Sequence, residues 1–161
     1  MAAANFASSA GFGAFFLFPL FIAERGGSEA DIGVIMGIFA LSSVLCRPWV
    51  SEMIDRLGRK RSYTVGALIM TFTPLVYLFF QGALAEFYFP LLLTRMVHGV
   101  GLAICFTAAF TFIADIVPPP RLNEGIGMFG ISGLLGMAVG PALAELIVRF
   151  WGFSAFFPAT E

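Results

Sequence analysis

The sequence predicts an all-α membrane protein, a bundle of helices that cross a bilayer. Of its 161 residues, 59% are hydrophobic and 12% are charged, whereas a soluble domain is about 25% charged. The mean hydropathy is +0.92. A soluble chain of this length cannot enclose 20 Phe side chains, because a small domain buries too little of its surface. We therefore expect a lipid bilayer around the chain. The net charge of −1 indicates no particular partner, and no nucleic acid is expected.

Five apolar stretches are long enough to cross a membrane, which takes about 20 helical residues. They cover approximately residues 5–23, 30–54, 62–81, 87–116 and 122–150. The first has no Lys or Arg before it and no cleavage site of small residues after it, so it is not expected to be a signal peptide. The second follows Ser28, and Asp31 three residues later completes a capping box. The fifth is entered through three consecutive prolines, residues 118–120, which cannot continue a helix.

A run of charged residues separates the second and third stretches. Residues 32–46 and 62–85 carry no charge, but the segment SEMIDRLGRKRS between them carries Asp55, Arg56, Arg59, Lys60 and Arg61. Gly58 suits a tight turn from one helix to the next. Asp55 precedes Arg59 by four residues, and Glu52 precedes Arg56 by four, so both pairs have the spacing of a favourable acid–base pair on one helix.

The basic residues also predict the orientation of the chain. Lys and Arg favour the cytoplasmic side of a membrane, and the charged run lies in the connection between the second and third stretches. Arg121 lies in the connection between the fourth and fifth, whereas Arg25 and Arg149 lie at the opposite ends of the stretches. We therefore expect the N-terminus and these two connections in the cytoplasm.

Three segments now resemble one family. SEMIDRLGRKR resembles the signature of the major facilitator superfamily between helices 2 and 3, G-x-x-x-D-R-x-G-R-K-R, with Ser51 in place of the first Gly. The matching residues are Asp55, Arg56, Gly58, Arg59, Lys60 and Arg61. In the fourth stretch, LLLTRMVHGVGLA resembles the family pattern through Arg95, Gly99 and Gly101, with His98 where Gln is usual.

The fifth stretch resembles the antiporter branch of the family. GMAVGPALAE matches its G-x-x-x-G-P pattern through Gly136, Gly140 and Pro141, while Ala144 and Glu145 stand in place of its closing glycines. Glycines allow membrane helices to approach closely, and Pro141 removes one backbone hydrogen bond and is expected to kink the helix. We therefore interpret these residues as helix-packing residues, and the resemblance adds that the helix seals the path against leakage.

The resemblance implies that residues 1–161 form the first five helices of a six-helix half. Members of the family are built from two such halves, with the substrate path between them. On this interpretation the chain is an incomplete N-terminal transmembrane half, and its main protein partner is the C-terminal half of the same transporter. A short subunit that assembles with a separate partner is the alternative.

The function implied is secondary active transport of small molecules by alternating access, with proton-coupled export favoured by the antiporter pattern. The partners would be a small-molecule substrate and protons, no cofactor or metal is expected, and the location would be a bacterial inner membrane. An uptake carrier for sugars or organic acids is one alternative, and a non-transporting scaffold or assembly subunit is another. An enzyme is not expected, because no HExxH pair, Ser–His–Asp set or Cys/His cluster occurs, and Cys46 and Cys105 lie in apolar surroundings.

The resemblance further implies a gate lock on the cytoplasmic side. The Asp55 carboxylate would face the positive N-terminus of a helix in the other half, and Arg59 would pair with Asp115 at the inner end of the fourth stretch. The lock residues would be Asp55, Arg56, Gly58, Arg59, Lys60, Arg61 and Asp115. The alternative is that these charges only flank the spans and set their orientation.

Arg95 is the strongest signal that comes from the residues alone. It follows Glu86 by nine residues, which is about 13 Å of helix at 1.5 Å per residue, so it lies near the middle of a hydrocarbon core about 30 Å thick. An ionisable residue at this depth indicates function. His98 and Gly99 share its helix face, and we interpret the three as coupling or cavity residues. The alternatives are a structural Arg bonded to backbone carbonyls and a neutral, hydrogen-bonded His, since a nearby Arg disfavours a protonated imidazole.

Overall fold

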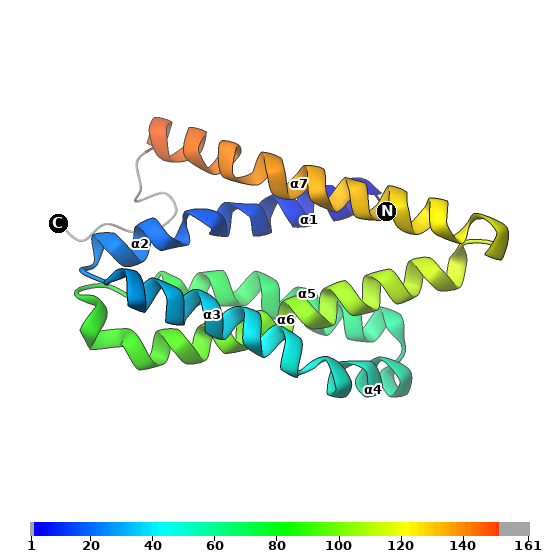
Figure 1. The fold of residues 1–161 in the computed structure, drawn as a ribbon, viewed down its shortest axis with the longest axis horizontal. Coiled ribbons are helices and arrows are strands. Elements are labelled where there is room, and N and C mark those ends of the chain that lie inside the picture. The colour runs from blue at the N-terminus through cyan, green and yellow to red at the C-terminus, as the bar shows by residue number, and fades with distance from the viewer. Residues whose placement is uncertain (1, 152–161) are drawn as a thin grey trace. The chain divides into compact units, whose positions relative to one another are not determined.

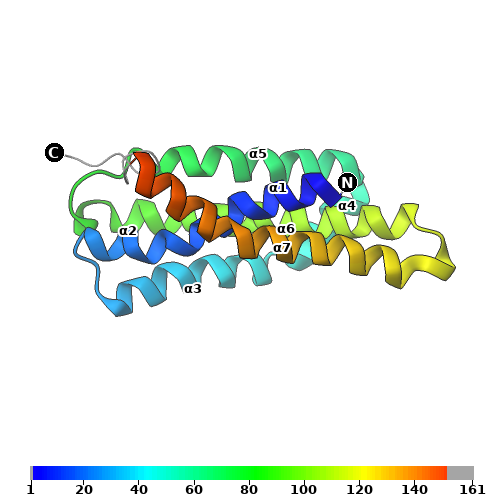
Figure 2. The same ribbon diagram turned by 90° about the horizontal axis from the view of Figure 1, so that it is seen from above.

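The computed structural model describes residues 2–151 and divides the chain into two compact units. Unit 1 contains the residues up to Phe21 together with those from Ile113 onward, and unit 2 contains Ile22–Phe112. Within residues 2–151 the regular structure is helical throughout, without a strand (Figures 1 and 2). The predicted all-α fold class is therefore confirmed.

The helices follow the apolar stretches closely. Their bounds are α1 Ala2–Gly13, η1 Ala14–Leu17, α2 Phe18–Glu24, α3 Glu29–Leu45, α4 Arg47–Leu57, α5 Arg59–Tyr77, α6 Leu84–Ile116, η2 Pro119–Arg121 and α7 Leu122–Trp151. The capping box predicted for Ser28 and Asp31 is present at the start of α3, where each side chain satisfies the other's backbone N–H.

In unit 1, α1 lies along α7 (Figures 1 and 2). The side-chain amide of Asn5 on α1 donates to the carbonyl oxygen of Phe129 at 2.8 Å and to the hydroxyl of Ser132 at 3.0 Å. The buried residues of α7 recur every three or four positions and so share one face. Between residues 122 and 146 they are Phe129, Gly133, Gly136, Gly140 and Ala144.

In unit 2, α6 packs closely against both α3 and α5. A Cβ on Gly99 of α6 would collide with the Phe39 carbonyl oxygen and the Ser42 hydroxyl of α3. A Cβ on Gly66 of α5 would lie 2.8 Å from the backbone nitrogen of Cys105 on α6. Small residues at these positions let the helix backbones approach each other, as in other membrane bundles.

Prolines interrupt two of the predicted spans. The first is divided by the short 3₁₀ segment η1, which precedes Pro19. The second is bent by 49° between α3 and α4, and Pro48 lies in the first turn of α4. A proline has no N–H to donate, and its ring clashes with the carbonyl four residues earlier. Both apolar stretches are therefore helical but interrupted, the first by η1 and the second by the bend between α3 and α4.

Gly58 alone connects α4 to α5. Its backbone has φ +83° and ψ 156°, a combination that is essentially restricted to glycine. The charged run is consequently helical on both sides of this residue, with Asp55 and Arg56 in the last turn of α4 and Arg59, Lys60 and Arg61 in the first turn of α5. The helix over the third predicted span therefore begins at Arg59, three residues before that span.

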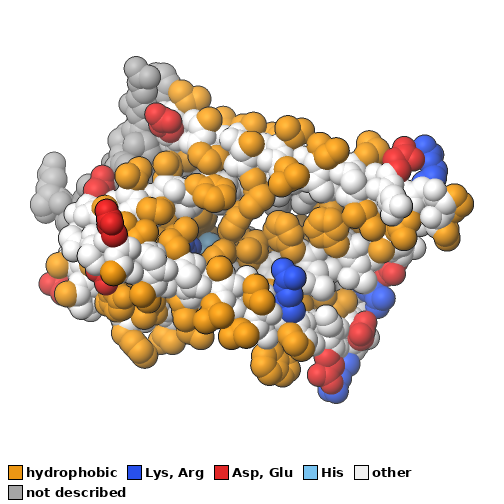
Figure 3. Space-filling view, in the orientation of Figure 1, with side chains coloured by type: hydrophobic (Ala, Val, Ile, Leu, Met, Phe, Trp, Pro, Cys, Tyr) orange, Lys and Arg blue, Asp and Glu red, His pale blue; other side chains and the backbone are white. Residues whose placement is uncertain are grey.

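Three segments of the described chain are long and apolar enough to cross a membrane, and the bent pair α3–α4 would be a fourth. They are Asn5–Glu24, Leu84–Ile116 and Pro119–Leu146. The helix α5 does not meet the same criterion; its first turn carries three cations, so the count of five spans stays a prediction. Mostly hydrophobic side chains face outward over α3 and over α7 (Figure 3), as lipid surroundings require.

Candidate functional site

The charged corner, defined as Asp55, Arg56, Gly58, Arg59, Lys60 and Arg61, lies where α4 meets α5. Five charged side chains are brought together by a one-residue turn, and all but Arg59, which is half-buried, are exposed. The cations of the α5 first turn lie at the positive end of that helix, which is an unfavourable place for them. Helix stability therefore does not explain their position.

Of the two acid–base pairs predicted here, one is confirmed and one is wrong. Arg56 donates to the carboxylate of Glu52 within α4 and forms an ion pair with it. Asp55 and Arg59 cannot form the same kind of pair, because Gly58 ends α4 between them and puts them on different helices. Both members of the confirmed pair are exposed, so the pair stabilises the helix only slightly.

Asp55 is the acid that remains available at the corner. Its side chain is exposed and forms no hydrogen bond or ion pair within the part of the chain that the structure describes. Asp115 lies in the last turn of α6 and is also exposed. Arg59 belongs to unit 2 and Asp115 to unit 1, so their pairing stays a prediction.

The second cluster surrounds Arg95 within unit 2, and it is buried. The Arg95 side chain is 1% exposed. Its guanidinium donates to the sulfur of Met36 on α3 at 2.7 Å. Its central carbon lies 5.0 Å from the ring centre of Phe39 on α3 and 6.0 Å from that of Tyr77 on α5. These contacts are of the cation–π kind, for which about 6 Å is the outer limit.

His98 and Gly99 lie beside Arg95, as the helix face predicted. His98 is fully buried, and its Nδ1 lies 3.1 Å from the Tyr77 hydroxyl. The imidazole and the Phe39 ring also form a T-shaped contact, with 5.4 Å between the ring centres. Gly99 allows this close packing, because its missing side chain lets α6 approach the Phe39 carbonyl oxygen and the Ser42 hydroxyl of α3.

Sequence reasoning missed three residues of this cluster, namely Met36, Phe39 and Tyr77. In the sequence they look like ordinary apolar filling of a membrane helix. Tyr77 offered the one available signal, because a tyrosine hydroxyl inside an apolar stretch needs a hydrogen-bond partner. The cluster offers a fixed charge, rings and hydrogen bonds, and no three His, Cys, Asp or Glu side chains gather as metal ligands within residues 2–151.

Gly136 and Gly140, two of the three α7 residues singled out for packing, lie on the helix face that meets α1. A Cβ on Gly136 would lie 3.0 Å from the backbone nitrogen of Ala10, and a Cβ on Gly140 would lie 2.8 Å from the Cα of Gly13. The helix continues through Pro141, which lies inside it. The geometry gives these glycines close contacts, while their role in sealing a path stays a prediction.

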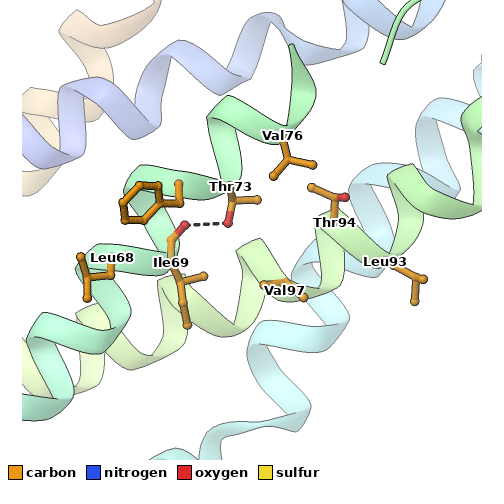
Figure 4. Close-up of a pocket in the computed structure, with 8 residues that line it drawn as sticks. Leu68, Ile69, Thr73, Val76, Leu93, Thr94 and Val97 are labelled. Carbon is orange, nitrogen blue, oxygen red and sulfur yellow. Dashed lines mark hydrogen bonds between the residues drawn. The ribbon is translucent and has the colours of Figure 1, made fainter. Parts of the chain in front are cut away.

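Unit 2 also has an apolar groove between α5 and α6, with a volume of about 470 Å³ (Figure 4). Its lining residues are Leu68, Ile69, Phe72, Thr73, Val76, Leu93, Thr94 and Val97. The hydroxyls of Thr73 and Thr94 bond to the carbonyl oxygens of Ile69 and Pro90 on their own helices. The groove therefore presents hydrocarbon almost exclusively, which suits contact with other apolar groups.

The chain is similar to several transporters over most of its length. It is 27% identical over 136 residues to an uncharacterized MFS-type transporter, MJ1560, of Methanocaldococcus jannaschii, which covers 84% of this chain and 34% of that protein. It is 27% identical over 143 residues to multidrug resistance protein 2 of Bacillus subtilis, covering 88% of this chain and 34% of the relative. It is 25% identical over 135 residues to the quinolone resistance protein NorA of Staphylococcus aureus, covering 81% and 34%.

The chain thus spans about a third of the length of these relatives. The family model described as Major Facilitator Superfamily matches residues 1–159. This match confirms the family resemblance predicted from the charged corner, the Arg95 segment and the glycines of α7. The chain belongs to the major facilitator superfamily.

Proposed function

We propose that residues 1–161 are the first five spans of the N-terminal half of a secondary active transporter that exports small, lipophilic molecules in exchange for protons. The observation that carries the proposal is the family match over residues 1–159 together with relatives named for multidrug and quinolone resistance. Because the chain spans about a third of those relatives, its partner would be a C-terminal half, and transport would proceed by alternating access of the two halves.

The proposed location is a bacterial cell membrane, with the N-terminus in the cytoplasm. The cations of the charged corner and Arg121 support this orientation, since Lys and Arg concentrate on the cytoplasmic side. The substrate would be a small molecule that reaches a path between the halves, and protons would supply the driving force.

The charged corner would act as a cytoplasmic gate lock. The exposed Asp55 carboxylate would face the N-terminus of a helix in the other half, an interaction that contributes about 0.3–2 kcal/mol. Arg59 would pair with Asp115, and a two-point Arg–carboxylate pair fixes orientation as well as adding energy. The lock would hold the cytoplasmic side closed and open as the halves move.

Arg95 would act in coupling, with His98 and Gly99 beside it. Its support is a charged side chain near the middle of a membrane-crossing helix, buried among residues of three helices. Gly136, Gly140 and Pro141 would keep α7 tight against α1 and limit leakage, supported by the close backbone contacts of the two glycines.

Asp55→Asn tests the lock in the full-length transporter that carries this chain. Asn keeps the size of the side chain but removes the charge that a helix N-terminus favours. We expect the transport rate to fall by roughly 2- to 30-fold, the factor that corresponds to losing about 0.3–2 kcal/mol of charge–dipole stabilisation. The measurement is efflux of a fluorescent quinolone from energised vesicles, with membrane insertion checked separately.

Glu52→Gln is the matched control, because Glu52 is an exposed acid one turn earlier on the same helix and is paired with Arg56. It should transport at nearly the parent rate. Equal rates for Asp55→Asn and Glu52→Gln would show that the corner sets orientation only. A parent protein that moves no quinolone along a proton gradient would contradict the proposed export itself.

A further inference from the structure

The surroundings of the Arg95 guanidinium point to a role for two rings that the family pattern does not include. We propose that Phe39 of α3 and Tyr77 of α5 are positioning residues that hold the charged guanidinium between their ring faces as a cation–π cage. Its central carbon lies 5.0 Å from one ring centre and 6.0 Å from the other. Because Tyr77 is 1% exposed, water cannot compete for the contact with its ring.

The physical reason is that a guanidinium removed from water needs compensation for its lost hydration. The face of an aromatic ring carries partial negative charge, and the attraction to a cation grows when the site is dry. The Met36 sulfur adds a soft acceptor at 2.7 Å from one guanidinium nitrogen. Rings and a thioether thus supply, from two neighbouring helices, a share of the stabilisation that a buried charge requires.

His98 fixes the ring of Tyr77 in this arrangement. Its Nδ1 lies 3.1 Å from the Tyr77 hydroxyl, and the two ring centres are 6.0 Å apart. Since His98 lies one turn after Arg95 on α6, the hydrogen bond ties the α5 ring to the same helix that carries the guanidinium. His98 therefore acts on Arg95 through Tyr77.

A cage of neutral rings leaves the net charge at Arg95 different from the one that a paired carboxylate would leave. Neutral rings stabilise a cation without cancelling it, so Phe39, Tyr77 and Met36 leave the guanidinium with its full positive charge. An anionic group that arrives during a transport cycle would still be attracted to it. This consequence rests on the proposed coupling role of Arg95, whereas the cage itself is a property of unit 2 alone.

The cage is tested first by stability, on this chain in detergent. Phe39 is replaced in turn by mono-, di- and trifluorinated phenylalanine, which withdraws charge from the ring face with little change in size. We expect the unfolding midpoint to fall stepwise, by a few degrees in total. The same series in an Arg95→Met background, where no cation is present, should give no stepwise fall.

Phe89 supplies the matched control, because it lies on α6, the helix that carries Arg95, but is 69% exposed. Its fluorination should leave the midpoint unchanged in both backgrounds. A fall that is equal with and without Arg95, or no fall at Phe39, would overturn the cage.

The positioning role is tested second, by quinolone efflux in the full-length transporter. We expect Phe39→Leu to lower the turnover number several-fold while KM changes by less than about twofold, and Phe39→Tyr, which restores a ring, to recover most of the turnover. Equal turnover of the Leu and Tyr variants would overturn the positioning role. An inactive parent would instead contradict the proposed function, and the stability series would still decide the cage.

Discussion

A single glycine separates the acid of the charged corner from three of its cations. With φ +83° and ψ 156°, Gly58 turns the chain from α4 to α5 in one residue and so brings the ends of two helices together. Arg59, Lys60 and Arg61 then lie at the positive end of α5, where each cation costs roughly 0.3–1 kcal/mol. Because these cations destabilise α5, their position is better explained by membrane orientation or by contact with a partner than by the stability of the helix.

Replacing Gly58 should therefore lower the free energy of unfolding, even though no other atoms crowd this glycine. Nothing lies within 4 Å of a Cβ built on Gly58, so the effect of Gly58→Ala would come from the backbone alone, at about 1–3 kcal/mol. The measurement is the free energy of unfolding in detergent. Gly37→Ala is the control, because Gly37 is helical and equally open, and it should gain up to about 1 kcal/mol. Equal effects of the two variants would contradict the assigned turn.

At the scale of helices, the structure divides five glycines of α7 into two groups. Gly133, Gly136 and Gly140 meet α1 at close range, whereas a Cβ on Gly127 or Gly130 would meet nothing within 4 Å. The spacing in the sequence showed a helix rich in small residues, but it could not show which of them face another helix. The first three carry the close approach between α1 and α7.

Gly136→Ala should therefore weaken the packing of α1 on α7. The new methyl would lie 3.0 Å from the Ala10 nitrogen and closer still to the Phe6 carbonyl oxygen, and overpacking of this kind costs about 1–3 kcal/mol. Gly127→Ala should be neutral or stabilising, since it removes a flexible residue from an open helix face. Thermal unfolding of both variants in detergent measures the difference, and a Gly127→Ala loss as large as that of Gly136→Ala would contradict this division.

Local patterns predicted the helices well and their neighbours poorly. The apolar lengths and the Ser28 capping box depend on adjacent residues, so both could be predicted from the sequence. The bend before Pro48 was missed because the apolar pattern continues through it. The partners of Arg95 were missed because Phe39 and Tyr77 come from other helices, and nothing in a run of apolar residues shows which ring will face a charge.

At the scale of the whole chain, the connections between spans alternate between the two sides of a membrane. The charged corner and the connection that contains Arg121 are separated by two helices, α5 and α6, so they should lie on the same side if both helices cross the bilayer. Their shared positive charge agrees with that parity. The connection before α3 should lie on the opposite side.

Cysteine labelling tests this arrangement in a variant that lacks Cys46 and Cys105. Suitable exposed positions are Lys60 in the corner, Asn123 at the start of α7 and Glu29 at the start of α3. Gly27 is unsuitable, because a Cβ there would lie 2.5 Å from Ile22 and 2.8 Å from Leu84.

With a membrane-impermeant maleimide on intact cells, Glu29→Cys should react at once, and Lys60→Cys and Asn123→Cys only after permeabilisation. Reaction of Lys60→Cys from outside would reverse the orientation. Opposite behaviour of Lys60→Cys and Asn123→Cys would mean that α5 or α6 does not cross the bilayer, because only an even number of crossings returns the chain to the same side.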